Sequence, residues 1–492
     1  MRRACVVGAG FGGLALAIRL QSEGLETVLI EARDKPGGVA YSWERDGFTF
    51  DAGPATITDP ARLEELWQLT GHDMVDDVEL MPVMPFYRLN WPDGMTFDYS
   101  NDDVALRRQI ARLAPADLAG YDEFLQYCAG AHEDAYVGLA HEPLHDLKGM
   151  LRAGSKLAKH QAWRSVHGIV SSQVKHPRLR EALSFTALLP GGNPMTTSAV
   201  YALIHKLEMD GGVWWARGGI NRLAAAMARH FERLGGTLRL ADRVTALHTI
   251  GDRVSEVECA SGWRERFDAV ASNADIMQTY RGLLRGTPRG AQMARKLARK
   301  RFGPSLFIVH FGLEGAWPGI PHHTVLFGPR YGEWFADIYQ HGVLPQDLLI
   351  FLHHPTVTDP GVAPPGKSTF QAVVPVAHLG KLPIDWDEAG PILERRVLDE
   401  IGRRLVPDIH DRIVTSFHYA PDDFEADLGA FHGSAFGLEP VFSQVGYWRP
   451  HNRDAKLRNF FLVGASTHPG AGIPAVLAGA KVTAGLMLEM LA

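Results

Sequence analysis

The chain has 492 residues, of which 46% are hydrophobic and 22% charged, and its formal net charge is −6. This length predicts two or three domains with a large buried core. The absence of a basic excess argues against a nucleic-acid partner. The three cysteines, Cys5, Cys128 and Cys259, are odd in number and widely spaced. We therefore expect reduced thiols in a cytosolic protein and exclude a disulfide framework.

The first 31 residues predict a β-α-β unit, with a strand at Ala4–Val7, a helix at Gly13–Ser22 and a strand at Thr27–Glu31. Arg2 and Arg3 before an apolar run are also typical of the start of a secretory signal. We favour the buried strand, because the glycines after the run would weaken a signal helix and no clean cleavage site follows.

A glycine loop, Gly8-x-Gly10-x-x-Gly13, joins the first strand to the first helix. In a dinucleotide-binding turn, the first glycine makes the tight bend, the second lets a pyrophosphate approach, and the third lets helix and strand pack closely. The N–H groups at the helix start would bind the phosphates. Glu31 follows Gly8 by 23 residues, a spacing that predicts a carboxylate on a ribose 2′-hydroxyl and disfavours NADP.

The segment after Glu31, "EARDKPGGVAYSW", resembles the extended nucleotide-binding motif of large FAD enzymes through Arg33, Gly37 and Gly38. Val39 departs from that motif, because it stands where an arginine that reaches the pyrophosphate is expected. We predict that FAD still binds, but more weakly by the loss of one charge-assisted contact, about 1.5–3 kcal/mol. We assign three further residues to the same cofactor site: Gly53, Pro54 and Val244.

The middle of the chain alternates between helical and strand patterns, which predicts an α/β protein. Irregular sequence is expected over 34–60 and mostly helix over 60–207. Further strands are expected at Thr237–Leu240, Asp268–Ser272, Ser305–Leu313 and Leu348–His353. No linker marks a boundary, so we predict interleaved domains. A discontinuous cofactor-binding domain would comprise 1–80, 210–300 and 425–492, and a substrate-binding, membrane-contacting domain would comprise 81–209 and 301–424.

The C-terminal segment from Phe460 onward has the same predicted order of elements as the N-terminal segment, a strand, a glycine-rich turn and a helix. Phe460–Val463 predicts a strand, the segment from Gly464 to Gly472 a turn, and Ile473 the start of a helix. The start of that helix would face an electron-rich partner, such as the edge of a reduced flavin ring. We therefore expect one end of the chain to hold the ADP half of a flavin nucleotide and the other end to cap its ring.

Several motifs resemble those of the bacterial-type phytoene desaturases over nearly the whole chain. They are the N-terminal block with "GAGFGGLALAIRLQ" and "GFTFDAGP", then "QAWRSV", "GGNP", "ASNAD", "HHTVLFGPRY", "FHGSAFGLEPV", "RPHNRD" and "NFFLVGASTHPGAGIP". The resemblance implies a Rossmann-type FAD-binding domain of the glutathione-reductase-like kind, interleaved with an α+β substrate domain. It also implies desaturation of phytoene to neurosporene or lycopene, with hydride transfer to the flavin and quinone or oxygen as electron acceptor.

The resemblance further implies an apolar tunnel and a peripheral position on the membrane, because the substrate is a hydrocarbon. Candidate tunnel segments are Leu183–Gly192, Ser305–Leu313 and Leu348–His354. Basic residues recur at helical spacing beside apolar ones, which favours either a helix on an anionic membrane or a solvated face. These basic residues are Lys148, Arg152, Lys156 and Lys159.

Two residues are candidate catalytic helpers, Arg152 and His468. The family places an acidic residue three positions before the arginine, but this chain has Gly149 there, so no carboxylate base is available at that point. His468 lies in the C-terminal turn, where positioning is as plausible a role as catalysis. The flavin itself is expected to carry the chemistry.

We predict no metal site. "HEPLH" at 141–145 contains Pro143, which breaks the helix that a zinc motif needs. The pairs His322–His323 and His353–His354 are neighbours that are expected to point apart on strands. Alternatives to a phytoene desaturase are another carotenoid desaturase or isomerase, an amine-oxidase-like flavoprotein, and a non-enzymatic prenyl-binding carrier.

Overall fold

A five-stranded parallel sheet brings both ends of the chain together. The computed structural model describes residues 2–53, 56–144 and 146–492. The strand order is β19-β13-β1-β2-β9, and each neighbouring pair is parallel. The strands are β1 (Arg3–Val7), β2 (Glu26–Ile30), β9 (Thr237–Arg239), β13 (Ala269–Ser272) and β19 (Phe460–Leu462). The predicted β-α-β start and the predicted strands near 237, 268 and 460 are confirmed within one or two residues.

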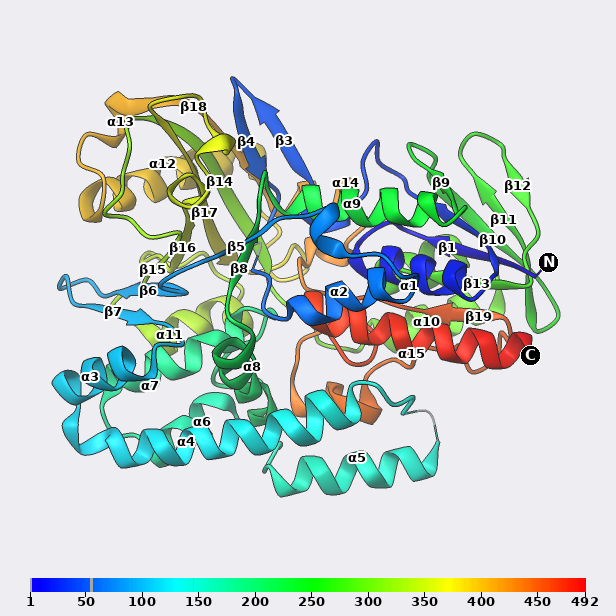
Figure 1. Cartoon of the computed structure of the whole chain (residues 1–492), viewed down its shortest axis with the longest axis horizontal. Coiled ribbons are helices and arrows are strands. Elements are labelled where there is room, and N and C mark those ends of the chain that lie inside the picture. Colours follow the sequence, from blue (N-terminus) through cyan, green and yellow to red (C-terminus); the bar gives the residue numbers. More distant parts are fainter. Residues whose placement is uncertain (1, 54–55, 145) are drawn as a thin grey trace.

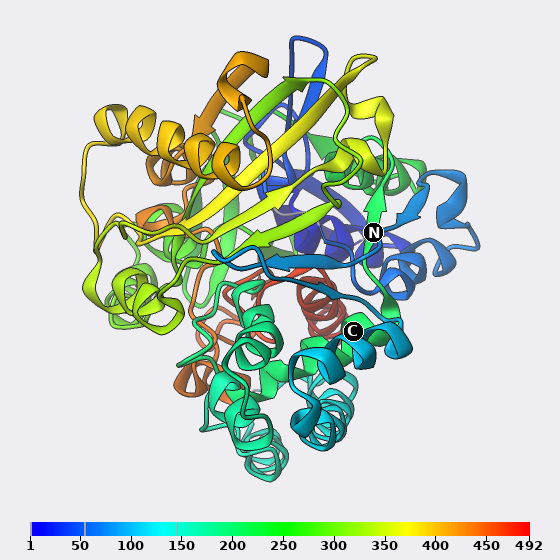
Figure 2. The ribbon, with the colours of Figure 1, turned by 90° about the vertical axis from the view of Figure 1, so that its left-hand side faces the viewer.

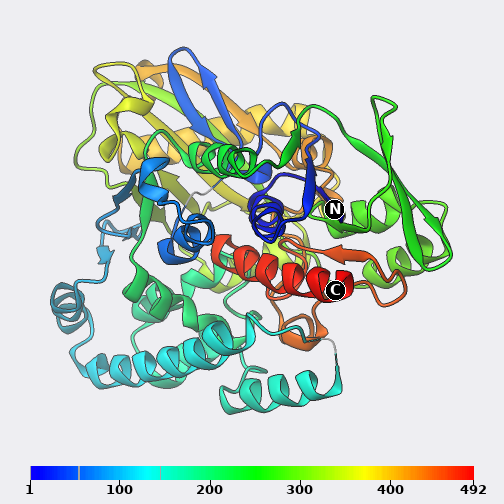
Figure 3. The same ribbon diagram turned by 45° about the vertical axis from the view of Figure 1, so that its right-hand side comes forward.

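The first and last long helices of the chain pack against each other beside this sheet (Figures 1 and 3). They are α1 (Phe11–Ser22) and α15 (Ile473–Leu491), and α15 begins at the predicted residue. Arg2 donates a hydrogen bond to the carbonyl of Ala492 at 3.4 Å, so the two termini meet. In the described part of the chain, α15 alone has the length and apolar composition of a membrane span, but half of that window is buried within the fold.

A seven-stranded mixed sheet forms a second layer, in the order β18-β14-β17-β16-β15-β6-β7. Only β15 and β6 pair in parallel. One face of this sheet packs on α12 (Trp386–Arg404) through a cluster of buried apolar side chains (Figure 2). The strands are β6 (Tyr87–Asn90), β7 (Thr96–Tyr99), β14 (Ser305–Glu314), β15 (His323–Leu326), β16 (Ile350–His353), β17 (Lys367–Val376) and β18 (Ile413–Tyr419).

The predicted separation of two histidine pairs is wrong for the first pair. His323 opens β15 and lies directly opposite His353 at the end of β16. His322 precedes the strand, so its side chain does not have to follow the alternation of strand side chains between the two faces of the sheet. The ring centroids of His322 and His323 are only 4.6 Å apart.

A helical region covers the lower part of the molecule in Figure 1. It contains α3 (Asp103–Leu113), α4 (Leu118–Ala131), α5 (Leu147–Lys159), α6 (Val166–Gln173), α7 (Pro177–Ser184) and α8 (Leu203–Gly211). Residues His132–Leu139 continue α4 as a π-helix, a feature that is frequent at functional sites. The predicted helical stretch is thus confirmed at α2 (Pro60–Gln68) and from residue 103 onward, whereas three short strands lie between residues 80 and 99.

Smaller elements connect the two sheets. A hairpin of β3 (Ser42–Arg45) and β4 (Phe48–Asp51) occupies sequence that was expected to be irregular, and β5 (Leu80–Pro82) pairs with β8 (Trp214–Ala216). An antiparallel meander consists of β10 (Val244–Ile250), β11 (Arg253–Cys259) and β12 (Arg264–Glu265). The other helices are α2 (Pro60–Gln68), α9 (Ile220–Arg233), α10 (Pro288–Leu297), α11 (Tyr331–Ala336), α13 (Ile409–Arg412) and α14 (Pro421–Leu428). The α/β class is confirmed, and the proposed domain limits stay a prediction.

Candidate cofactor and substrate site

A cavity of about 390 Å³ lies at the carboxyl ends of the parallel strands. The loops after β1, β2, β13 and β19 form its walls, together with the first turn of α15. Ligands of open parallel sheets bind at this edge, because the loops there diverge to opposite faces of the sheet. We call this space the first cavity.

Most of the predicted cofactor residues line the first cavity. They are Gly8, Gly10, Glu31, Gly37, Gly38, Gly53, Val244, Gly464, Gly472 and Ile473. Gly13 and Arg33 do not line it, and Pro54 lies outside the described residues. The two glycine-rich turns, more than 450 residues apart in sequence, therefore face one common space.

Gly13 supports the cavity through packing alone. A Cβ atom added to Gly13 would lie 1.9 Å from the carbonyl oxygen of Gly8, which is far inside van der Waals contact. Gly8 itself has φ +96°, a conformation that L side chains rarely adopt. The third glycine of the loop thus permits the close helix–strand approach that its spacing predicts.

Glu31 anchors the first glycine loop from inside the protein. Its buried carboxylate accepts hydrogen bonds from the backbone N–H groups of Ala9, at 2.7 Å, and Arg33, at 2.9 Å. The Arg33 guanidinium lies over the ring of Tyr41, 3.6 Å from its centroid, and 3.3 Å from the Asp427 carboxylate. Arg33 is therefore paired with protein groups beside the cavity, and its predicted cofactor contact stays a prediction.

Val39 lines the first cavity with 52% of its surface exposed. Among the described residues that line this cavity, Arg243 is the one cation. The position where the extended nucleotide-binding motif predicts an arginine is therefore exposed at the first cavity and uncharged in this chain.

Asn273 lies between the two glycine turns and contacts both. No role for it was predicted from the sequence. It follows β13, the strand between β1 and β19, and its amide donates to the carbonyl of Gly8 at 3.4 Å. A Cβ added to Gly12 or to Gly464 would lie 2.7 or 3.0 Å from its Oδ1 atom. The motif "ASNAD" marked this residue, but only the strand order shows that it separates the two turns.

The C-terminal turn is fixed by two buried polar residues of the segment "RPHNRD". The Arg449 guanidinium donates to the carbonyls of Thr467, at 3.0 Å, and Ala465, at 2.5 Å. The Asn452 amide donates to the carbonyl of His468 at 3.0 Å. Since these donors satisfy backbone groups of an irregular turn, they hold the start of α15 in place.

A second cavity, of about 180 Å³, adjoins the first. The two share Thr56, Leu189, Ala471, Gly472 and Ile473. The rest of its wall is mostly apolar and comes from the π-helix, α5, α8 and the residues after β19. Of the three predicted tunnel segments, Leu183–Gly192 contributes Leu189 and Pro190, Ser305–Leu313 contributes Leu306 to the first cavity, and Leu348–His354 lines neither.

Glu208 is the one carboxylate among the described residues that line the second cavity. It is fully buried on α8 and accepts a hydrogen bond from the Tyr87 hydroxyl at 2.6 Å, while its Oε2 atom has no partner among the described residues. Burial raises its pKa to about 8, although the Tyr87 hydrogen bond opposes the shift. Sequence reasoning missed Glu208, because "HKLEMDG" has the pattern of an ordinary amphipathic helix end.

The two predicted catalytic helpers lie in different environments. His468 lines the second cavity and is buried, with Nε2 3.0 Å from the carbonyl of Leu139. Burial lowers the pKa of His468 to about 4, so its ring is neutral at pH 7. Arg152 lines neither cavity; it lies exposed on α5 and forms an ion pair with Glu142 at 2.9 Å. Arg152 is therefore a surface residue that contacts neither cavity.

The first cavity has the features that a flavin nucleotide requires. Glycines line much of its wall, and residues at the starts of two helices, α1 and α15, also line it. Helix starts favour negative charge, such as a pyrophosphate or a reduced ring.

Comparison with known proteins agrees with this site. The family model described as "Flavin containing amine oxidoreductase" matches residues 11–488. A solved structure of putrescine oxidase bound to putrescine has the same fold, with a TM-score of 0.64 at 16% identity over 99% of both chains. The chain therefore belongs to the flavin containing amine oxidoreductase family.

Relatives with higher sequence identity assign the chain to a smaller group within this family. A lycopene-forming phytoene desaturase from Paracoccus sp. (strain N81106) is 51% identical over 100% of this chain and 98% of its own length. A neurosporene-forming phytoene desaturase from Cereibacter sphaeroides is 38% identical over 98% of this chain and 94% of its own length. Within the flavoprotein family, the chain belongs to the bacterial phytoene desaturases.

Proposed function

We propose that the chain is an FAD-dependent phytoene desaturase that forms lycopene in carotenoid biosynthesis. The observation that carries this proposal is the junction of the two cavities: a glycine-lined space for a nucleotide opens, at the start of α15, onto an apolar space. The relative at 51% identity is named lycopene-forming and that at 38% neurosporene-forming, which favours lycopene as the product.

The residues that line the first cavity favour FAD over a shorter flavin. The lining extends from Glu31 and Val244, beside the first turn, to Gly472 and Ile473, beside the last. The backbone around Gly10 would bind the pyrophosphate, and the start of α15 would lie at the ring end. Glu31 disfavours a 2′-phosphate in the same place.

When bound, the flavin supplies the hydride acceptor for the oxidation of a carbon–carbon single bond. The residues of the chain then have two tasks. The apolar walls contributed by Leu157, Leu189 and Leu207 exclude water and bind a hydrocarbon without polar groups. A base in the same cavity accepts the proton from the neighbouring carbon.

Glu208 is the better of two candidate bases. A general base is most effective when its pKa lies near the working pH. The pKa of Glu208 is raised to about 8 and that of His468 is lowered to about 4, so the carboxylate binds a proton far more strongly. We assign proton acceptance to Oε2 of Glu208 and positioning of the C-terminal turn to His468.

We propose that the protein is cytoplasmic and associates peripherally with the membrane through α5. Leu157 of α5 lines the second cavity, while Leu147 and Leu151 on the same helix are 64% and 63% exposed. Trp163 follows the helix and is 58% exposed. The same helix carries the basic residues Lys148, Arg152, Lys156 and Lys159, a combination typical of helices at an anionic bilayer. Arg152 pairs with Glu142, and Lys156 and Lys159 pair with Asp134. A hydrocarbon would thus pass from lipid to the cavity across one helix.

Liposome flotation tests this surface. The double variant Leu151→Ser, Trp163→Ser should lose most of its binding to vesicles that contain anionic lipid. The matched control is Ile392→Ser, because Ile392 on α12 is 65% exposed but lies on another face of the molecule. Equal flotation of the double variant and the control would overturn the assignment of α5.

Co-expression with phytoene synthesis in a bacterium tests the function. The wild-type chain should turn phytoene-accumulating cells pink, and chromatography should identify lycopene as the main product. With purified protein and liposome-bound phytoene, added quinone or oxygen should each be tried as electron acceptor. Colourless cells that contain folded, flavin-loaded protein would exclude the proposal, and oxidation of amines by that protein would favour the amine-oxidase alternative.

A further inference from the structure

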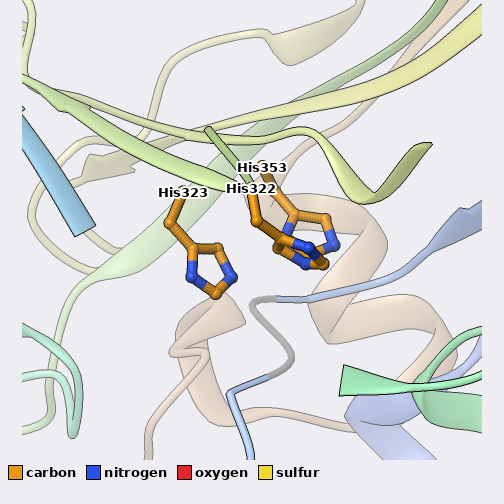
Figure 4. A group of neighbouring side chains, drawn as sticks. All are labelled: His322, His323 and His353. Atoms are coloured by element: carbon orange, nitrogen blue, oxygen red, sulfur yellow. The ribbon is translucent and has the colours of Figure 1, made fainter. Parts of the chain in front are cut away.

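Three buried histidines converge behind the wall of the second cavity. His322, His323 and His353 come from the adjacent ends of β15 and β16, and Figure 4 shows their rings on the same side of the sheet. One nitrogen from each ring lies within 4.8 Å of those of the other two. All three residues are at most 2% exposed.

The hydrogen bonds around the cluster leave its inner nitrogens free. The Phe86 carbonyl can only accept, so His323 must donate to it from Nδ1, at 2.9 Å, and Nε2 then carries a lone pair. Nδ1 of His322 lies 2.6 Å from the Thr358 hydroxyl. Nε2 of both residues, and both nitrogens of His353, have no hydrogen-bond partner among the described residues.

This arrangement is that of metal-binding histidines. A ligand histidine commonly donates its outer N–H to a carbonyl or a hydroxyl, which fixes the ring and directs its other nitrogen to the ion. Each of the three rings has a nitrogen without a partner among the described residues, and one nitrogen from each ring lies within 4.8 Å of those of the other two, which is the placement that an ion requires.

We propose that His322, His323 and His353 bind one divalent transition-metal ion, with Zn²⁺ as the ion of choice. Three imidazoles without a thiolate suit zinc, and water completes a tetrahedron. Tetrahedral bonds of about 2.0–2.1 Å would place the nitrogens about 3.3 Å apart. Side-chain rotations suffice to bring them there from within 4.8 Å, since the three residues already face one another.

The ion would join the ends of two neighbouring strands close to the candidate base. His323 stacks on Tyr87, at 5.5 Å between centroids, and Tyr87 donates to Glu208. Trp215 packs against His322 and His353 from another side, at 5.2 and 5.1 Å. Aromatic rings thus lie on two sides of the site, and an ion bound there would hold the ends of β15 and β16 together.

The test uses the full-length, untagged, flavin-loaded protein. After treatment with EDTA, incubation with ZnCl₂ and desalting, mass spectrometry should find about one zinc per chain in the wild type. His353→Ala should retain less than about a tenth of that amount. His354→Gln is the matched control, since His354 neighbours the cluster but stacks on Phe370 and donates to the Ile320 carbonyl. Zinc should also raise the melting temperature of the wild type and the control, but not of His353→Ala.

A second measurement, made on the wild type alone, tests the proposal even if His353→Ala fails to fold. The zinc K-edge absorption spectrum of the wild type should show about three imidazole nitrogens at about 2.0–2.1 Å. No zinc above background in the reloaded wild type would overturn the proposal and leave ordered water as the partner of these nitrogens. Equal zinc in His353→Ala, or a spectrum without imidazole scattering, would also overturn it.

Discussion

The first and second cavities adjoin, but they are built on different principles. The first is lined mainly by turns of one parallel sheet, and its shape depends on backbone that glycine leaves uncovered. The second is lined by side chains from separate helices, and its apolar lining depends on which side chains those helices direct into it. A nucleotide site can thus be encoded in short local motifs, whereas a hydrocarbon site requires the whole fold.

Their common wall is the start of α15. Gly472 and Ile473 line both cavities, so the turn that Arg449 and Asn452 hold in place borders the two proposed sites. Changes confined to one cavity should therefore separate flavin binding from turnover, and four substitutions test that separation.

The largest effect is expected at Gly13. Gly13→Ala would force a Cβ to 1.9 Å from the Gly8 carbonyl, and overpacking of this kind costs about 1–3 kcal/mol or more. The helix and the strand must then separate, so purified protein should contain no flavin absorbance near 450 nm. Gly485→Ala on α15 is the control, because its Cβ would meet nothing within 4 Å. A yellow Gly13→Ala protein would show that tight packing here is not needed.

A smaller effect, on turnover alone, is expected at Glu208. Glu208→Gln should retain its flavin and lower the rate of phytoene desaturation about a hundredfold, the usual contribution of a general base. Because the pKa of Glu208 is about 8, the carboxylate that accepts a proton is a minority at pH 7. The wild-type rate should therefore rise with pH toward 8 and level off above it.

The same pH profile provides the control for Glu208. The glutamine variant should lose the rise with pH while keeping its flavin spectrum. An unchanged profile in the variant would assign the proton to another group.

At Val39, flavin retention should change without a change in the second cavity. Val39→Arg restores a cation near the pyrophosphate, and because the position is 52% exposed, solvent should reduce the gain to about tenfold slower flavin loss. Dialysis followed by absorbance measures the loss. Identical retention in the wild type and the variant would show that the missing arginine costs nothing.

The smallest effect is expected at His468. Since its pKa is about 4, His468 is a poor proton acceptor at neutral pH. His468→Gln, whose amide can still donate to the Leu139 carbonyl, should slow turnover less than about tenfold. A loss as large as that of Glu208→Gln, with flavin retained, would reverse the two roles.

The sequence predicted much of the glycine-lined wall of the first cavity but little of the second cavity. Gly8, Gly10 and Glu31 form one local pattern, and each lies where that pattern predicts. Glu208 belongs to no pattern: an acidic residue near a helix end is usually solvated, and only its burial beside Tyr87 distinguishes it. Asn273 was within a recognised motif, but its contact with both turns depends on the order of three strands.

One element was missed although its signal was present. Asp46-Gly47 joins β3 to β4, and both residues have positive φ, at 53° and 82°. Asp-Gly between two short apolar–polar alternations is a strong hairpin signal. The histidine cluster carried no such signal, because it depends on the register between β15 and β16 rather than on spacing along the chain.

The position of β19 beside β13 also has a consequence for how the protein is made. A ribosome that adds about 5–20 residues per second needs roughly 20–90 s to proceed from the first glycine turn to the last. From the synthesis of β13 until that of β19, the edge of β13 that pairs with β19 is open, and the pocket for the coenzyme is half built. A flavin can be captured firmly only at the end of translation, so a chain that terminates early should emerge without colour.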